Sequence, residues 1–287
     1  MIIVRIWEGL GNQMFQYAYA RALKEKGIDV RLDLNKAYDE TFEKYRNNAQ
    51  RENQIQNFKI SLPSIDMAQY RRYEYLSKDT WLKKTVFYLQ SHLLWKYRLY
   101  EEQIQSYSDK TAGIRGNYYV KGWFQSERYF KDIRNILLKE FTPKEKIRIS
   151  KELREALKEP ESVSLHVRRG DYVKADIALN KIYYERAIAY IEQNYIKPIF
   201  VIFSDDLKWV KENIHINGKC IFVNEEKKLE DYEELLIMSR CRTNIIANST
   251  FSWWAAWLNQ NEDKVVIAPR KWLKGQNNIV PKEWLIL

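Results

Sequence analysis

The amino-acid sequence predicts an α/β fold built from two Rossmann-like units, and three observations support this. The first residues alternate as strand, turn, helix and strand, and strands alternate with helices again from residue 162 onward. A charged segment at 144–161, which ends in Pro160, separates these regions. Regular alternation of this kind is typical of parallel sheets covered by helices. We therefore expect two domains, 1–155 and 156–287.

The first domain is expected to open as a βαβ unit. Residues 2–6 are apolar and β-branched, residues 14–23 have apolar side chains at helical spacing, and residues 29–34 alternate as a strand. From 38 to about 118 the pattern is weaker and largely helical. This part contains a basic and aromatic stretch at 81–100. The stretch has two interpretations: peripheral contact with an anionic membrane surface, or a helix packed in an irregular domain, which we favour.

The second domain is expected to contain a doubly wound parallel sheet. The predicted strands are 162–167, 199–203, 220–223, 244–247 and 265–268, the last of which should end the sheet. The predicted helices between them are 182–194, 207–213, 231–239 and 251–258. Ligands of such sheets bind outside the carboxyl ends of the strands. The polar residues that follow each predicted strand are therefore the candidates for a ligand site.

Composition limits the classes of partner. With 48 Lys and Arg against 38 Asp and Glu, the net charge is +10, which favours a polyanionic partner such as nucleic acid, an anionic membrane or a phosphorylated substrate. The longest apolar run, 253–258, is far shorter than the roughly 20 residues that cross a bilayer. No secretory leader is visible, and two cysteines cannot form a disulfide framework. The simplest expectation is a soluble cytoplasmic protein.

Two adjacent arginines follow the strand predicted at 162–167. Arg168 and Arg169 precede Gly170 and Asp171. A guanidinium group has a planar fork of N–H donors that matches phosphate oxygens, and its charge is permanent. Two of them can neutralise a diphosphate without a metal ion. The alternative is a surface arginine pair bridged to Asp171; we favour the diphosphate site.

Acidic residues follow the strand predicted at 199–203. Ser204, Asp205 and Asp206 come directly after it. A carboxylate at this position can accept hydrogen bonds from a guanine edge or from ribose hydroxyls. Ser204 or Asp205 is equally suited to cap the next helix. Both roles can hold together.

Small polar residues open the helix predicted at 251–258. Its N–H groups and positive dipole end favour phosphate, although ordinary capping explains Ser249 and Thr250 equally well. The nearby tryptophans are expected to pack in the core. The residues of this motif are Asn248, Ser249, Thr250, Phe251 and Ser252.

Two glycines lie in the turn between the first strand and helix, in the run Glu8-Gly9-Leu10-Gly11-Asn12-Gln13. A dinucleotide fingerprint would need a third glycine at position 14, which is methionine, so that interpretation fails. The sequence also has no Asp-x-Asp pair, no histidines at metal-ligand spacing, no Walker A loop and no G-x-S-x-G elbow. We therefore expect no metal site.

Together these segments resemble the α-1,2-fucosyltransferases of glycosyltransferase family 11. The resemblance spans nearly the whole chain in the family's order. The matching segments are GLGNQMFQYA (9–18), WFQSERYF (123–130), HVRRGDY (166–172), FSDD (203–206) and NIIANSTFSWWAAWL (244–258).

The resemblance implies a GT-B fold, with two facing Rossmann-like domains and a cleft between them. It implies that the C-terminal domain binds GDP-fucose and that the N-terminal domain is the acceptor side. The implied reaction transfers L-fucose, with inversion and without metal or other cofactor, to the 2-hydroxyl of a terminal β-galactoside. Such an acceptor would belong to a surface polysaccharide or oligosaccharide.

By motif match, Arg168 and Arg169 should face the diphosphate, supported by Ser249, Thr250 and Ser252. Asp205 or Asp206 is expected near guanine or ribose, and His166 near the nucleotide sugar. Three residues of the first domain should line the opposite side of the cleft: Gly11, Asn12 and Gln13.

One departure from the family pattern concerns the catalytic base. The family usually has two glycines before leucine, and this chain has Glu8 in place of the first. Glu8 is either a general base for the acceptor hydroxyl or a side chain that points to solvent, which we favour. Asp171 and His166 are the other candidates for the base.

Three alternatives remain. Another GDP-6-deoxyhexose is the alternative donor. A non-catalytic sugar-binding protein would explain the aromatic residues but not the paired arginines. A basic nucleic-acid-binding protein would explain the charge, but no basic face or nucleic-acid-binding module is visible, so we expect no nucleic-acid partner.

Overall fold

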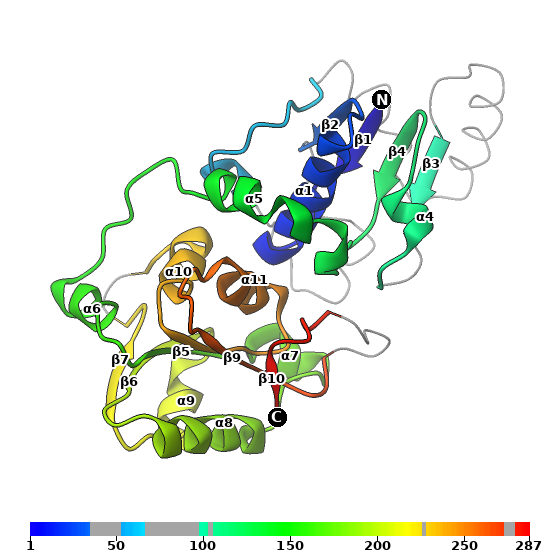
Figure 1. The fold of residues 1–287 in the computed structure, drawn as a ribbon. Coiled ribbons are helices and arrows are strands. Elements are labelled where there is room, and N and C mark those ends of the chain that lie inside the picture. Colours follow the sequence, from blue (N-terminus) through cyan, green and yellow to red (C-terminus); the bar gives the residue numbers. More distant parts are fainter. Residues whose placement is uncertain (35–52, 67–97, 103–105, 226–227, 273–278) are drawn as a thin grey trace. The chain divides into compact units, whose positions relative to one another are not determined.

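The computed structural model describes residues 1–34, 53–66, 98–102, 106–225, 228–272 and 279–287. The chain divides into two compact units, Met1–Lys144 and Glu145–Leu287. Each unit contains one parallel sheet with helices packed on it (Figure 1). This confirms the predicted α/β class with two Rossmann-like units, while their facing arrangement stays a prediction.

The division between the units lies at residue 144, whereas the sequence suggested 155. Helix α6 (Lys151–Ala156) follows the division and contacts strand β6 (Ile199–Ser204) of the second sheet. The charged segment is therefore not only a linker, because it contributes a helix to the second unit.

The first unit has a four-stranded parallel sheet in the order β2-β1-β4-β3. Its strands are β1 (Ile2–Arg5), β2 (Val30–Asp33), β3 (Arg98–Glu101) and β4 (Tyr118–Lys121). The α-helices in its described ranges are α1 (Leu10–Glu25), α4 (Asp109–Ala112) and α5 (Arg134–Glu140). Short 3₁₀ helices lie at Gln54–Asn57, Glu127–Tyr129 and Lys131–Ile133. Helix α1 packs against β1 and β2.

Two predictions in the first unit were wrong. Helix α1 begins at Leu10 rather than at 14, because Gly9 has an extended backbone at the N-cap and the polar residues after it form the first turn. Residues 98–101 were expected in a largely helical region, but they form strand β3 because they pair in parallel with β4. The rest of the basic and aromatic stretch, 81–97, lies outside the described residues.

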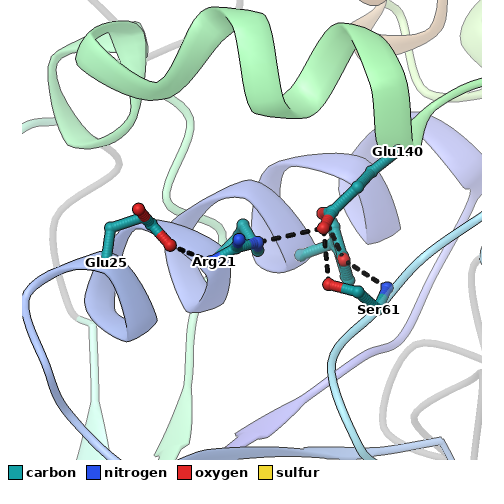
Figure 2. A network of polar contacts seen from close by, with 5 residues as sticks. Arg21, Glu25, Ser61 and Glu140 are labelled. Carbon is teal, nitrogen blue, oxygen red and sulfur yellow. Dashed lines mark hydrogen bonds and ion pairs between the residues drawn. The ribbon is translucent and has the colours of Figure 1, made fainter.

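A polar network ties three segments of the first unit together (Figure 2). Glu140 of α5 accepts hydrogen bonds from Tyr17 Oη at 2.6 Å, Arg21 Nε at 3.1 Å and Ser61 Oγ at 2.5 Å. Arg21 also pairs with Glu25 at 2.6 Å. Because the Glu140 carboxylate is largely buried, these partners replace the water it would otherwise bind.

The second unit has a six-stranded parallel sheet in the order β10-β9-β8-β5-β6-β7. The strands besides β6 are β5 (Ser162–Val167), β7 (Lys219–Phe222), β8 (Thr243–Ile245), β9 (Val265–Ala268) and β10 (Leu285–Ile286). The helices after α6 are α7 (Gly170–Lys174), α8 (Lys181–Asn194), α9 (Leu207–Asn213), α10 (Asp231–Met238) and α11 (Thr250–Leu258).

The strand and helix alternation predicted for the second unit is confirmed, with one error at its end. The strands at 162–167 and 265–268 and the helix at 207–213 have the predicted bounds. However, 265–268 is not the last strand, because the two-residue strand β10 pairs with β9. Helix α7 was also missed, because five residues directly after the arginine pair give no clear helical periodicity.

The chain reverses its direction of winding between β5 and β8. It runs from β5 to β6 to β7 on one side and then returns to β8 on the other side of β5. Helices α8 and α9 cover one face of the sheet and α10 and α11 the other (Figure 1). The carboxyl ends of β5 and β8 therefore meet at the topological switch point, where open α/β sheets bind ligands.

Three further expectations can be compared with the structure. Within the described ranges, no helix is long and apolar enough to cross a membrane. Cys220 and Cys241 are both free thiols. The tryptophans of α11 pack in the core as predicted, with Trp253 and Trp254 0% exposed.

Candidate functional site

Arg168 lies directly after β5, at the switch point, and two carboxylates hold it. Its Nε and Nη2 donate to Asp171 Oδ1 at 3.0 and 2.8 Å, and its Nη1 lies 3.0 Å from Asp205 Oδ2. Burial alone would lower the pKa of Arg168, but the charges of Asp205 and Asp171 outweigh it and raise the pKa. These contacts do not use all five guanidinium N–H donors. Arg168 is thus fixed in place while retaining N–H groups for a ligand.

Arg169 is held through its backbone N–H, its Nε and the face of its guanidinium group. Its backbone N–H donates to Asp205 Oδ1 at 2.8 Å, and its Nε donates to Asp206 Oδ2 at 3.3 Å. Its guanidinium carbon lies 3.8 Å from the centre of the Trp209 ring. Stacking of this kind fixes the plane of the guanidinium group. The second arginine is therefore also oriented before any ligand binds.

Gly170 allows Asp205 to approach the arginine loop. A Cβ atom at position 170 would lie 2.7 Å from Asp205 Oδ2, well inside van der Waals contact. The sequence suggested Asp205 or Asp206 for a guanine or ribose contact, and it treated an Arg168–Asp171 bridge as the alternative to a ligand site. In the structure that bridge is present, and both aspartates contact arginines. Their interaction with a nucleotide stays a prediction.

The residues after β6 also start helix α9. Ser204 Oγ accepts from Asp206 N at 3.0 Å, and Asp206 Oδ1 accepts from Trp209 N at 3.1 Å. Asp206 is therefore the N-cap, and the expectation that Ser204 or Asp205 caps this helix was wrong. The reason is that Leu207 is the first helical residue, so the preceding residue takes the capping position.

The residues after β8 place the start of α11 at the switch point. Ser249 is the N-cap, and its Oγ accepts from Phe251 N at 3.4 Å. Thr250 begins the helix. Ser252 is buried, and its Oγ donates to Ser249 O at 3.4 Å, so its hydroxyl is used within the helix. Asn248 Nδ2 donates to two backbone carbonyls, at 2.9 and 3.3 Å.

Several buried polar atoms near the arginine pair have no hydrogen-bond partner in the described part of the chain, and two of them lie at the ends of neighbouring strands. These two are His166 Nδ1 at the end of β5 and Asn248 Oδ1 after β8. Burial and the charge of Arg168 lower the pKa of His166 to about 3, so its imidazole is neutral at physiological pH. Buried polar groups are nearly always paired. Both atoms are unpaired polar groups buried beside the switch point.

Sequence reasoning missed Glu234 of α10. Its carboxylate accepts from Asn224 Nδ2, and Asn224 follows β7. Burial raises the pKa of Glu234 to about 7, although the hydrogen bond from Asn224 and the charges of Lys228 and Arg168 act in the opposite direction. Asn224 could have been predicted as a site residue, because it is a polar residue that follows a strand. Glu234 was not, because only the packing of α10 brings it within electrostatic range of Arg168.

In the first unit, the Glu8 to Gln13 motif builds the turn from β1 to α1. Glu8 has φ +69° and is 3% exposed, so the expectation that it points to solvent was wrong. Gln13 Nε2 donates to Glu8 O at 2.7 Å, and Gln13 Oε1 accepts from Ile55 N at 3.0 Å. Asn12 Oδ1 accepts from Gln125 Nε2 at 2.8 Å. Gly11 lies in the first turn of α1.

Comparison with known proteins gives matches over the whole chain. The model of the family described as Glycosyl transferase family 11 matches residues 1–286. The O-antigen biosynthesis glycosyltransferase WbnK of Escherichia coli is 30% identical over 94% of each chain. An alpha-1,2-colitosyltransferase of Escherichia coli is 30% identical over 99% of this chain and 98% of the relative. Galactoside 2-alpha-L-fucosyltransferase Sec1 of Mus musculus is 24% identical over 90% of this chain and 64% of the relative.

Solved structures with partial similarity include fucosyltransferases. The fucosyltransferase NodZ from Bradyrhizobium aligns with a TM-score of 0.42 and 17% identity over 89% of this chain and 90% of that one. A variant of Arabidopsis thaliana FUT1 in complex with GDP aligns with a TM-score of 0.46 and 10% identity over 93% of this chain and 70% of that one.

Proposed function

The chain belongs to glycosyl transferase family 11, and from this premise we propose that it transfers L-fucose from GDP-fucose to the 2-hydroxyl of a terminal β-galactoside. The second unit binds the nucleotide sugar and the first unit binds the acceptor. The reaction inverts the anomeric centre and uses no metal ion. Relatives named as α-1,2-colitosyl and galactoside α-1,2-fucosyl transferases support the linkage.

The observation that carries this proposal is the arginine pair at the switch point. As the bond between the sugar and the diphosphate breaks, negative charge grows on the leaving phosphate. Arg168 and Arg169 are already oriented by Asp171, Asp205, Asp206 and Trp209. A preorganised donor to such a charge is worth about 3 kcal/mol. Permanent cations in these positions perform the role that a divalent ion has in metal-dependent transferases.

The acceptor hydroxyl loses its proton late in this mechanism and needs weak assistance. Base catalysis contributes roughly 10²–10⁴-fold. The three candidate bases differ in their surroundings. Asp171 is paired with Arg168, and His166, with a pKa of about 3, is a weak base. Glu8 is buried at the turn after β1. Stabilisation of the leaving group therefore carries most of the rate.

A second donor has specific support. The relative named alpha-1,2-colitosyltransferase matches 99% of this chain at the same 30% identity as WbnK. Colitose is L-fucose without its 3-hydroxyl group, so the two donors differ at one position of the sugar ring and share the GDP moiety. The arginine site serves both equally, and donor choice depends on contacts to the sugar.

A GDP-release assay tests the proposal. Wild-type protein is incubated with GDP-fucose or GDP-colitose and a panel of β-galactosides, with and without EDTA. We expect acceptor-dependent GDP release with GDP-fucose that EDTA leaves unchanged. Preference for GDP-colitose would reassign the donor, loss of activity in EDTA would refute metal independence, and no release with either donor would refute the proposed reaction.

A further inference from the structure

A second cluster of aromatic and polar side chains lies at the switch point of the first sheet. Strand β1 has β2 on one side and β4 on the other, although the chain reaches β4 only after β2 and β3. The carboxyl ends of β1 and β4 are therefore adjacent. The segments that follow them are residues 6–9 and 122–126, and the second contains the WFQS sequence.

Hydrogen bonds from α1 fasten these two segments to each other. Gln16 Oε1 accepts from Trp7 N at 2.9 Å, and Gln16 Nε2 donates to Gly122 O at 3.2 Å. Gln125 Nε2 donates to Asn12 Oδ1 at 2.8 Å. The side chains that project from the two segments are consequently held at fixed positions, as ligand recognition requires.

Both segments also contain a strained backbone position. Among the described residues, the non-glycine residues with positive φ are Glu8, Phe124, Asp176 and Asn224. Glu8 has φ +69° and Phe124 has φ +50°, so two of these positions lie at this edge. The left-handed conformation costs about 1–2 kcal/mol for such residues. Strain of this kind is retained mainly at functional sites.

A partly buried carboxylate, that of Glu102, holds the strained conformation at Phe124. Glu102 Oε2 accepts from the backbone N–H groups of Trp123 at 2.8 Å and of Phe124 at 2.7 Å. Its Oε1 accepts from Tyr129 Oη at 3.2 Å. Glu102 therefore fixes where the Trp123 side chain leaves the backbone.

The chemistry of the cluster suits a neutral sugar. The Trp123 ring is partly exposed and lies 4.6 Å from the Trp7 ring at 40°. Indole faces pack on the C–H faces of pyranose rings, and side-chain amides bind sugar hydroxyls. Ser126 Oγ is 1% exposed and has no partner among the described residues. The Trp123 face and the amides beside it can recognise hydroxyl groups, while the cations of Arg5 and Lys121 lie over the Trp7 ring at 5.4 and 5.3 Å.

We propose that Trp123, Gln125 and Asn12 form a subsite for a neutral pyranose of the acceptor glycan, with the ring stacked on Trp123. This inference rests on the proposed function, which supplies the acceptor class. Trp123 acts as a specificity-determining residue, and Glu102 positions it.

Binding rather than turnover gives the direct test. Lactose is added to GDP-saturated protein, and its affinity is measured by saturation-transfer NMR for wild type, Trp123→Ala, Gln125→Ala and Tyr118→Ala. Tyr118 is the matched control, because it is a partly exposed aromatic residue at the amino end of β4, whereas Trp123 follows the carboxyl end of that strand. GDP affinity is measured by calorimetry on each variant and reports whether the second unit is intact.

We expect Trp123→Ala to weaken lactose binding about tenfold or more, which corresponds to roughly 1.4 kcal/mol, with unchanged GDP affinity. Gln125→Ala should weaken it less, and Tyr118→Ala should not. Lactose affinity that survives in both Trp123→Ala and Gln125→Ala contradicts the subsite, as does wild type that binds no lactose. If Trp123→Ala does not fold, the lactose affinity of Gln125→Ala tests the subsite, and an affinity equal to that of wild type contradicts it. Wild type that binds lactose through Trp123 but transfers no sugar contradicts the proposed function alone.

Discussion

At the scale of single residues, Glu8 occupies a backbone position that glycine adopts without strain. Its φ of +69° lies in the left-handed region. We predict that Glu8→Gly raises the free energy of unfolding above that of Glu8→Ala by about 1 kcal/mol. Both variants lack the side chain, so the difference isolates the backbone. Urea unfolding measures it, and equal stabilities would contradict the strain.

The same pair of variants tests whether Glu8 is the catalytic base. Because the proposed mechanism depends on leaving-group stabilisation, Glu8→Gly and Glu8→Ala should both retain most of the fucosyl transfer. A loss of transfer near the roughly 10²–10⁴-fold typical of a missing base would instead make Glu8 that base.

His166 should make stability depend on pH. Its pKa in the folded state is about 3, against an ordinary value of 6.5. Between these values the unfolded state binds more protons, so stability falls as the pH decreases. From pH 7 to 5 the loss of unfolding free energy is about 2 kcal/mol.

We predict that His166→Gln loses less stability than wild type over this pH range in thermal unfolding. His215→Gln, at an exposed position, should behave as wild type; identical pH profiles for all three proteins would refute the neutral histidine.

At the same scale, the sequence predicts the position of the arginine pair better than it predicts which residues contact the pair. Arg168 and Arg169 directly follow the predicted strand 162–167, in which polar and apolar residues alternate, so their place at a strand end is readable. That Asp205 and Asp206 contact these arginines depends on the parallel register of β5 and β6, in which Val167 pairs with Ser204. Glu234 has no local signal, because its position depends on how α10 packs.

At the scale of secondary-structure elements, the Glu140 network joins α5 to α1 and to the segment at Ser61 (Figure 2). Removing the carboxylate leaves the Tyr17 O–H and the Arg21 Nε–H without their acceptor in a largely buried place, although Tyr17 Oη still accepts from Ser61 N at 3.0 Å. We predict that Glu140→Ala lowers the free energy of unfolding by about 3 kcal/mol. Urea unfolding of the full chain measures the change.

Glu25 is the matched control for this network. It pairs with the same Arg21 side chain at 2.6 Å, but its own side chain is 42% exposed. Exposed pairs contribute roughly 0–1 kcal/mol, so Glu25→Ala should cost much less than Glu140→Ala. Equal costs for the two variants would show that the network does not stabilise the unit through burial.

The elements of the second unit were easier to predict than those of the first. Strand β6 is apolar along nearly its whole length because helices cover both faces of the sheet. Strand β3 has partly exposed and exposed residues at the edge of the first sheet, so its sequence lacks that pattern. The α1 start was missed because its first turn is polar and serves the β1–α1 turn rather than the core.

At the scale of the whole molecule, two parallel sheets each place a cluster of side chains at a topological switch point. The second unit has the arginine pair between β5 and β8, and the first unit has Trp123 and its neighbours between β1 and β4. The sequence predicts two units because strand and helix alternation begins twice. It misplaces their boundary because α6 is short and lies within a charged segment.

The central claim is that the arginine pair binds the diphosphate of a GDP-sugar. Calorimetric titration of GDP into wild type, Arg169→Ala and Arg240→Ala tests it directly, because Arg240 is an exposed arginine of the same unit at the opposite end of the sheet. We predict that Arg169→Ala weakens GDP binding by roughly 10–100-fold and abolishes fucosyl transfer, whereas Arg240→Ala changes neither. Wild-type GDP affinity together with near-normal turnover in Arg169→Ala would contradict it.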